Sequence, residues 1–422
     1  MTGSAILVLN AGSSSLKFAL FDADADGGEG RLAHGAVTGI GGGKASLSMT
    51  GPLGAGRGAG RGAGQGAGQG AGQGAGTTAR PGRFDSHRAA LDAVLRAVRA
   101  EGGGHPLVGV GHRVAHGGPD CDCPVPVTPG LRDRLRALVP LAPLHLPANI
   151  DGIEAIASLR PDLPQIACFD TAFHNGLPRL ARMTGLPRAI ETPELRRYGY
   201  HGLSYEYIVV ALARDGVDLS SERIVVAHLG NGASLAAIRG GRSIETTMGF
   251  STLAGVPMGT RSGDVDPGLV LHLMRERGMT AASVGEMLMS GSGLLGLSGQ
   301  SSDMRDLIER HDAASAEAIG YFCYHVRRHL VALTAPLEGI DRLVFTGGIG
   351  ANAAPVRALV CAGLGYLGID LDPAANAGGR RIVSAPGAGV TVEVRQTDEE
   401  AMIATHVARL CGGRSEPARE AS

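Results

Sequence analysis

Two short segments of the chain combine the residue types that hold a phosphate group. The first, VLNAGSSSLKFAL, runs from residue 8 to residue 20 and reads as an apolar strand, a turn of small hydroxyl residues and a second strand. Its turn offers backbone N–H groups and hydroxyl donors, and no bulky side chain blocks an anion. Lys17 adds a cation on the strand that follows. The segment predicts a phosphate site, although glycine and serine are also ordinary hairpin residues.

The second segment, AHLGNGASLAAI at residues 227–238, has the same order of strand, small polar turn and strand. Its Asn231-Gly-Ala-Ser-Leu235 corresponds to Gly12-Ser-Ser-Ser-Leu16, which stands about one domain length earlier in the chain. We expect two related domains whose hairpin turns grip one polyphosphate from opposite sides. A chance likeness between the two segments is the alternative.

The composition is that of a globular protein. The chain has 422 residues, of which 44% are hydrophobic and 19% charged, so two domains are expected. A formal net charge of −1 and the absence of Trp give no support for a nucleic-acid or membrane partner. The six cysteines form no C-x-x-C pair, and no apolar run is long enough for a membrane-spanning helix. These features predict a cytoplasmic protein with reduced thiols.

Apolar strands and amphipathic helices alternate along the chain, which predicts an α/β fold. Strands are expected at residues 108–111, 165–169, 223–229 and 342–345, and helices at 204–214, 312–333, 398–410 and after a cap at Asp85 or Ser86. One segment differs, because residues 51–76 are almost entirely GAGR and GAGQ repeats. Since this segment has no hydrophobic face, we expect a disordered surface insertion.

Three familiar kinds of site are excluded. The chain has no G-x-x-x-x-G-K-[ST] motif, so it is not a P-loop nucleoside triphosphatase (NTPase). The first strand is followed by AGSSS rather than by the glycine pattern of a dinucleotide site. His112 and His116 have the spacing of zinc-protease ligands, but Arg113 replaces the glutamate that such proteases need and would repel a metal ion.

A series of strings in a fixed order resembles the acetate/propionate kinase (acetokinase) family. The strings are VLNAGSSSLKF, GHRVAHGG, APLHLPANI, FDTAFH, YGYHGLS, AHLGNGAS, MGTRSGDVDPG, SSDMRD, FTGGIGAN and TDEEAMI. Any one of them could arise by chance, whereas the whole series in the family's order is specific. The resemblance covers nearly the whole chain and omits only the glycine-rich insertion and the extreme tail.

The resemblance implies a two-domain α/β fold similar to that of actin, the sugar kinases and the heat-shock chaperone ATPases, with duplicated ribonuclease H-like domains. It implies an N-terminal domain of residues 1–174 with 400–422 and a C-terminal nucleotide-binding domain of residues 175–399. Two related domains that close on a nucleotide would account for the likeness between the two phosphate segments. The family also implies a homodimer.

The family passes the γ-phosphoryl group of ATP reversibly to a short carboxylate, so the resemblance implies that acetate and ATP give acetyl phosphate and ADP, with Mg²⁺ or Mn²⁺. A carboxylate is already ionised at pH 7, so the reaction needs no general base. The reactants must be positioned, and positively charged groups must stabilise the loose, negatively charged transition state. Arg113 would hold the acyl carboxylate, and Arg261 would steer it and the phosphoryl group. Both are expected in glycine-flanked loops; surface or helix-capping arginines are the alternative.

The remaining roles are also implied by the family motifs. Asp170, His201 and His145 would join the two arginines as catalytic residues. Asn10 and Glu399 would hold the metal ion beside Asp170, although Glu399 could instead cap a helix. The acyl group would contact Arg113, Ala115, Leu144 and Thr252. The nucleotide and its phosphates would contact Ser13, Ser15, Lys17, His228, Leu229, Gly230, Asn231, Gly232, Asp303, Met304, Arg305, Gly348, Ile349, Gly350 and Asn352.

Several positions depart from the family pattern. Ala115 stands where a valine is frequent, and the lost methyl groups leave room for roughly one carbon, which shifts substrate preference by about 1–3 kcal/mol. Thr252 replaces a frequent proline in the same expected pocket. Propionate, or a broader range of short-chain carboxylates, is therefore the alternative to acetate. An actin-like nucleotide-binding regulator or chaperone-type ATPase is the alternative from another class, and the second anion-binding arginine argues against it.

Overall fold

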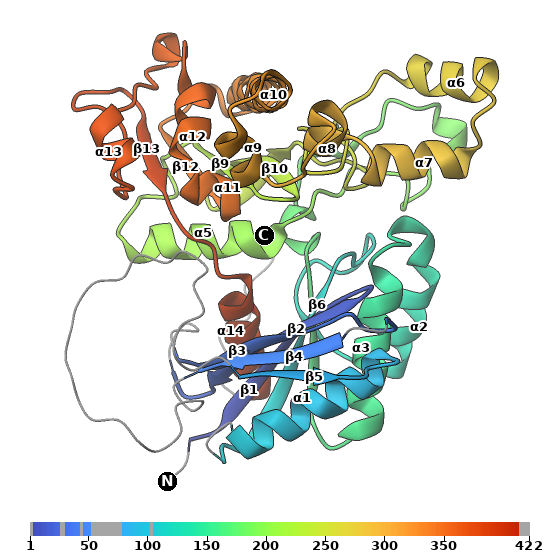
Figure 1. Cartoon of the computed structure of the whole chain (residues 1–422). Helices are drawn as coiled ribbons and strands as arrows, with labels where there is room; N and C mark the ends of the chain where they lie inside the picture. Colours follow the sequence, from blue (N-terminus) through green and yellow to red (C-terminus); the bar gives the residue numbers. More distant parts are fainter. Residues whose placement is uncertain (1–2, 26–29, 43–44, 52–77, 102–103, 413–422) are drawn as a thin grey trace. The chain divides into compact units, whose positions relative to one another are not determined.

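The computed structural model of the chain describes residues 3–25, 30–42, 45–51, 78–101 and 104–412. The chain splits into two compact units (Figure 1): unit 1 comprises Met1–Asp170 with Glu399–Ser422, and unit 2 comprises Thr171–Asp398. The domain limits expected from the sequence, 174/175 and 399/400, stay a prediction. The insertion predicted at residues 51–76 lies outside the described residues, apart from Gly51.

Unit 1 is built on an eight-stranded sheet in the order β5-β4-β3-β2-β1-β6-β8-β7. The strands are β1 (Ala5–Gly12), β2 (Ser15–Asp22), β3 (Arg31–Thr38), β4 (Ala45–Thr50), β5 (Thr78–Gly82), β6 (Leu107–Val114), β7 (Val125–Pro126) and β8 (Gln165–Phe169). β1 and β2 form the hairpin predicted from the first phosphate segment, with Gly12 opposite Ser15 at the turn. β1, β6 and β8 run parallel, so their carboxyl ends meet at one edge of the sheet.

Helices cover both faces of the unit 1 sheet. They are α1 (His87–Glu101), α2 (Pro129–Ala137), α3 (Leu146–Leu159) and α14 (Glu399–Cys411). Leu7 and Leu9 of β1 point into the core that contains α1 and α3. Gly109 and Gly111 of β6 lie against α14, where a Cβ on Gly111 would stand 2.3 Å from Cγ2 of Ile403. The glycines therefore let α14 pack directly on the strands, and odd-numbered residues of β6 face that helix.

Unit 2 contains a five-stranded sheet in the order β11-β10-β9-β12-β13. Its strands are β9 (Ile224–Leu229), β10 (Ala233–Arg239), β11 (Arg242–Thr246), β12 (Arg342–Thr346) and β13 (Thr391–Val394). The two β-hairpin pairings are antiparallel and the next two pairings are parallel, which is the pattern of β3-β2-β1-β6-β8 in unit 1. The likeness between the two phosphate segments thus reflects equivalent hairpins, β1–β2 and β9–β10, in equivalent sheets.

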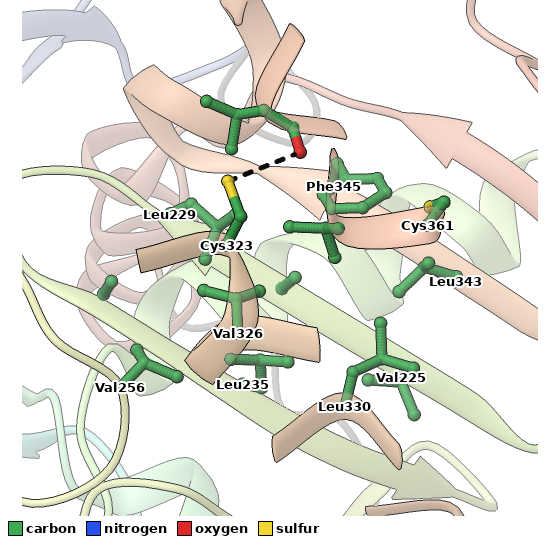
Figure 2. Close-up of a cluster of buried hydrophobic side chains, with 14 of the residues drawn as sticks. Val225, Leu229, Leu235, Val256, Cys323, Val326, Leu330, Leu343, Phe345 and Cys361 are labelled. Carbon is green, nitrogen blue, oxygen red and sulfur yellow. Dashed lines mark hydrogen bonds between the residues drawn. The ribbon is translucent and has the colours of Figure 1, made fainter. Parts of the chain in front are cut away.

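The unit 2 sheet is buried on both faces. Its helices are α4 (Arg179–Arg182), α5 (Gly202–Arg214), α6 (Pro267–Glu276), α7 (Ala281–Ser290), α8 (Gly293–Ser298), α9 (Met304–Arg310), α10 (Ala313–Leu337), α11 (Gly347–Asn352), α12 (Ala354–Cys361) and α13 (Pro373–Ala377). Val225 and Leu229 pack with Val326 and Leu330 of α10, and the Cys323 thiol of the same helix donates to the Val356 carbonyl at 4.0 Å (Figure 2). The alternate residues of β9 and β10 pack against α5 instead.

The four strands and four helices expected from the sequence are all present, with ends displaced by a few residues. The helix expected at 312–333 is α10, which Asp312 caps through the backbone N–H of Ser315. Ser86 rather than Asp85 caps α1, because its hydroxyl accepts from the backbone N–H of Ala89. All six cysteines are free thiols, and four of them are buried. Within the described ranges no helix has the length and hydropathy needed to cross a bilayer.

Candidate active site

In unit 1, three predicted site residues gather at the carboxyl ends of the parallel strands. Asn10 lies near the end of β1, Arg113 is the penultimate residue of β6, and Asp170 follows β8 directly. Asp170 is held there because its backbone N–H donates to the Val114 carbonyl at 3.0 Å. The expectation that Arg113 lies in a glycine-flanked loop is wrong. The preceding glycines belong to the strand, where they allow the close approach of α14.

Arg113 binds two predicted site carboxylates. Its Nε and Nη2 donate to Oδ1 and Oδ2 of Asp170 at 3.0 and 2.8 Å, and its Nη1 lies 3.3 Å from Oε2 of Glu399 at the start of α14. Burial disfavours the charge of Arg113, but the carboxylates of Asp170 and Glu399 outweigh it and raise the pKa of the guanidinium. Burial, together with Glu399, raises the pKa of Asp170 against the attraction of Arg113. The group carries one cation and two carboxylates, so it favours a further positive charge.

Asn149 of α3 is a buried residue that joins two of these predicted segments. Its side-chain N–H₂ donates to the carbonyl of Ala11 at 2.9 Å, and its oxygen accepts from the backbone N–H of Ala115 at 3.0 Å. The phosphate turn is also held from α1, where His87 Nε2 lies 2.7 Å from the carbonyl oxygen of Gly12. Sequence reasoning assigned no role to Asn149, although it stands in the quoted string APLHLPANI.

The other predicted residues of unit 1 surround this cluster or the hairpin turn. His145 precedes α3 and attracts the Asp170 carboxylate electrostatically. Ala115, which follows β6, is half-buried, whereas Leu144 is exposed. Lys17 stands opposite Asn10 across the β1–β2 ladder, and its side chain is exposed. Ser13 is exposed in the turn, and Ser15 begins β2.

In unit 2, two predicted histidines lie together on the α5 face of the sheet. The His201 and His228 rings are stacked, with centroids 4.3 Å apart. His201 precedes α5 with a left-handed φ of 59°, and its Nδ1 lies 2.9 Å from the hydroxyl of Ser234. His228 Nδ1 lies 2.8 Å from the hydroxyl of Ser204. Ser234 and Ser204 were not identified from the sequence, although Ser234 ends the family string AHLGNGAS and Ser204 ends YGYHGLS.

Arg261 lies beside these histidines in a loop, as expected. A Cβ on Gly232 would stand 3.1 Å from His201 Nε2 and 3.8 Å from Arg261 Nη1, so both side chains approach the second phosphate turn. Arg261 donates to the Thr252 carbonyl at 3.3 Å, and burial lowers the pKa of its guanidinium. Across the described part of the chain, no carboxylate lies within ion-pair distance of Arg261. Arg261 is therefore a largely buried cation without a carboxylate neighbour among the described residues.

The predicted nucleotide residues of unit 2 form two groups. The turn of Gly230, Asn231 and Gly232 lies beside the start of α11, where a Cβ on Gly347 (φ 76°) would stand only 2.6 Å from the Leu229 carbonyl. Gly348 and Asn352 of α11 are exposed beside this turn, Ile349 is half-buried, and Gly350 is buried.

The second group belongs to α9. Asp303 caps this helix through the backbone N–H of Arg305 at 2.9 Å, and the two side chains form an exposed ion pair. Met304 and, on β9, Leu229 have side chains buried in the core, so only their backbone atoms remain for a nucleotide. These local contacts give Asp303 and Arg305 a structural role whether or not a nucleotide is bound.

Comparison with known proteins identifies the family. Residues 70–405 match the model described as the acetokinase family. A protein named acetate kinase from Rhodopseudomonas palustris is 45% identical over 97% of this chain and 98% of its own length. The crystal structure of Porphyromonas gingivalis acetate kinase superposes with a TM-score of 0.83 at 36% identity, covering 96% of this chain and 99% of that one.

A second solved structure supports the same fold. A propionate kinase from Francisella tularensis superposes with a TM-score of 0.86 at 31% identity, again covering 96% and 99% of the two chains. The two-domain α/β kinase fold and the family resemblance predicted from the sequence motifs are therefore confirmed. The chain belongs to the acetokinase family.

Proposed function

We propose that the chain is an acetate kinase, which transfers the γ-phosphoryl group of ATP to acetate and forms acetyl phosphate and ADP reversibly. The observation that carries this proposal is the environment of Arg261. Its largely buried guanidinium has no carboxylate partner among the described residues, and it lies beside His201 and the glycine-rich turn at Gly232. Such a cation is suited to a phosphoryl group, whose negative charge compensates it.

The residues of unit 2 would bind and polarise the polyphosphate. Backbone N–H groups of the turn at Asn231 and Gly232 would bind its oxygens, and the side chain of Arg261 would neutralise the transferring group. His201 would donate a hydrogen bond from Nε2. In unit 1, Arg113 would orient the acyl carboxylate. Because that carboxylate is already an anion, these residues move no proton; they position the reactants and stabilise charge.

A divalent cation fits the donor set at the carboxyl edge of the unit 1 sheet. Asp170, Glu399 and Asn10 offer oxygen ligands, and Arg113 forms ion pairs with the first two. No group of three or more His, Cys, Asp or Glu side chains arranged for a metal occurs in the described residues. Mg²⁺ bound beside phosphates commonly takes one or two carboxylates plus water and phosphate oxygens, so Asp170 and Glu399 could hold Mg²⁺ or Mn²⁺ in this way. When bound, the ion would neutralise charge on the polyphosphate.

Acetate is the proposed acyl substrate, and propionate is the second candidate. The specific observation that favours propionate is Ala115, whose small side chain follows β6 two residues after Arg113. A pocket that gains room for one methylene discriminates by about 1–3 kcal/mol, so activity on both acids is expected.

The assay that tests the proposal traps acyl phosphate with hydroxylamine during incubation with ATP, Mg²⁺ and acetate, propionate or butyrate. Acetate is expected to give hydroxamate and equimolar ADP, propionate a smaller or similar amount, and butyrate the least. Chelation of the metal with EDTA should stop the reaction, and either Mg²⁺ or Mn²⁺ should restore it. The proposal fails if no carboxylate yields hydroxamate above a reaction that lacks the protein.

We also propose a homodimer located in the cytoplasm. The segment before His201 exposes several apolar side chains, among them Leu180 (85% exposed), Leu186 (52%) and Ile190 (51%), a pattern that favours burial against another protein surface. Sedimentation equilibrium of the full chain should give twice the chain mass. The double variant Leu186→Asp/Ile190→Asp is expected to sediment as a monomer. A wild-type chain that is itself monomeric would refute the proposal.

A further inference from the structure

A short chain of hydrogen bonds leads from the core of unit 2 to His201. The Tyr205 hydroxyl lies 2.6 Å from the Ser234 hydroxyl, which in turn lies 2.9 Å from His201 Nδ1. Tyr205 comes from α5 and Ser234 from β10, and both are fully buried at 0% exposure. Ser234 reaches α5 because it alternates with Leu235, which points to the opposite core.

The Tyr205–Ser234 and Ser234–His201 hydrogen bonds have room for one bridging proton each, two in all. The hydroxyls of Tyr205 and Ser234 carry one proton each, and a proton on His201 Nδ1 would be a third. Burial raises the pKa of Tyr205, so its hydroxyl stays protonated. If Tyr205 donates to Ser234 and Ser234 donates to Nδ1, every proton is bonded. With a proton on Nδ1, one buried hydroxyl proton would find no acceptor in the described part of the molecule, which is unfavourable.

We propose that Ser234, oriented by Tyr205, is a positioning residue that holds His201 as the tautomer with its proton on Nε2. That nitrogen faces the phosphate turn, 3.1 Å from where a Cβ of Gly232 would stand. A neutral imidazole bonded through a bare Nδ1 must donate from Nε2. His201 is thereby set as a donor to a phosphoryl oxygen before the substrate binds. This inference deepens the proposed function and rests on it for the identity of the acceptor.

The neighbouring histidine is consistent with this assignment. His228 receives the same kind of contact, since the buried hydroxyl of Ser204 lies 2.8 Å from its Nδ1. Its ring stacks on His201 at 4.3 Å and 21°, close enough that two positive rings would repel each other. Arg261 adds a further positive charge near Gly232. Arg261 and any charge on His228 would therefore oppose a positive charge on the His201 ring.

The direct test is the tautomer of His201 in the full chain labelled with ¹⁵N-histidine. Long-range ¹H–¹⁵N correlation spectra distinguish a protonated from a bare ring nitrogen, and His201→Gln identifies the signals among those of the 14 histidines. A protonated Nε2 and a bare Nδ1 are expected near pH 7.5. A wild-type ring with its proton on Nδ1, or with both nitrogens protonated, would overturn the assignment.

Variants test whether Ser234 sets this state. Ser234→Ala is expected to let the proton populate Nδ1, and to lower kcat by about tenfold while the KM for ATP stays within about twofold. Ser234→Thr keeps the hydroxyl and should restore both the spectrum and kcat. Tyr205→Phe keeps the ring volume and should give a smaller change in the same direction. An unchanged tautomer in Ser234→Ala refutes the role of Ser234, and the exposed Ser220→Ala serves as control.

The histidine spectrum and the kinase assay test the two proposals separately. If the wild-type chain makes no acyl phosphate but shows the expected tautomer, the proposed function is wrong and the hydrogen-bond chain stands. If the chain is an active kinase and His201 carries its proton on Nδ1, the hydrogen-bond assignment is wrong and the function stands.

Discussion

Asn149 and Ala11 are joined by a buried hydrogen bond of 2.9 Å from the side-chain amide to the backbone carbonyl. The same side chain accepts from the backbone N–H of Ala115 at 3.0 Å. One residue of α3 thus fixes the end of β1, which carries Asn10, relative to the segment that follows Arg113. Arg113, the proposed anion-binding residue, and the turn of the first hairpin are therefore held in place by this amide as well as by the sheet.

Asn149→Asp should remove one of the two hydrogen bonds that Asn149 makes and keep the other. The carboxylate keeps an acceptor for Ala115 but loses the donor to Ala11 and brings negative charge toward that carbonyl. We expect the free energy of unfolding to fall by about 1–3 kcal/mol, measured by urea denaturation, and hydroxamate formation to fall with it. Ser158→Ala, at an exposed position of the same helix, is the control. Wild-type stability and activity in Asn149→Asp would contradict the linking role.

Arg113→Ala and Arg261→Ala should lower turnover to a similar extent, but they should differ in their effect on the free energy of unfolding. Arg113→Ala leaves the buried Asp170 without its partner, so we expect a loss of about 3 kcal/mol in the free energy of unfolding. Arg261→Ala removes a largely buried cation that has no carboxylate neighbour in the described ranges, so stability should stay the same or rise. Each variant should lose at least about 10²-fold in turnover while ATP binding changes little.

Urea denaturation and ATP titration of both arginine variants check these expectations, with the exposed Arg275→Ala on α6 as control. Normal turnover in either variant would refute its role as an anion-binding residue. A stability loss for Arg261→Ala as large as that for Arg113→Ala would show that Arg261 has a structural partner.

The sequence predicted most of the elements because their signals are local. The hairpin turns, the cap at Ser86 and the alternation of strands and helices depend on neighbouring residues. Arg113 was misplaced for the same reason, since glycines read locally as loop residues. In β6 they serve a distant partner, because a Cβ on Gly111 would collide with Ile403 of α14. Only the tertiary structure distinguishes these two uses of glycine.

The residues that support the candidate site could not be predicted from the sequence because their partners are distant in the chain. Asn149 and Ala11 stand in separate strings, and nothing in either string shows that they meet. Tyr205 and Ser234 likewise become partners only when α5 packs on β10. Motif resemblance identified residues with assigned chemistry, whereas the hydrogen-bond partners of those residues depend on the register of strands and on helix packing.

His174 should make stability depend on acid pH. Its ring is buried between the hydroxyl of Ser243 at 2.7 Å and the carbonyl of Tyr200 at 3.0 Å, and burial lowers its pKa from 6.5 to about 4. Between these two values the unfolded chain binds the extra proton and the folded chain does not. The free energy of unfolding should therefore fall as pH drops through this window, by on the order of 3 kcal/mol.

The measurement is urea denaturation of the wild-type chain and His174→Asn between pH 4.5 and 7.5, a range set by the two pKa values. The variant is expected to be less stable at neutral pH and to show a flatter pH dependence. The exposed His272→Asn should keep the wild-type slope. Equal slopes for wild type and His174→Asn would show that His174 does not hold the depressed pKa.

Ala115→Val should shift the acyl preference toward acetate. The two methyl groups that this substitution adds are expected to remove the room for the third carbon of propionate. We expect the ratio of kcat/KM for propionate over acetate to fall by about tenfold, the effect of one methylene. The hydroxamate assay with both acids measures the ratio, and Ala281→Val on the exposed surface of α7 is the control for added bulk elsewhere. An unchanged ratio would show that Ala115 does not line the acyl pocket.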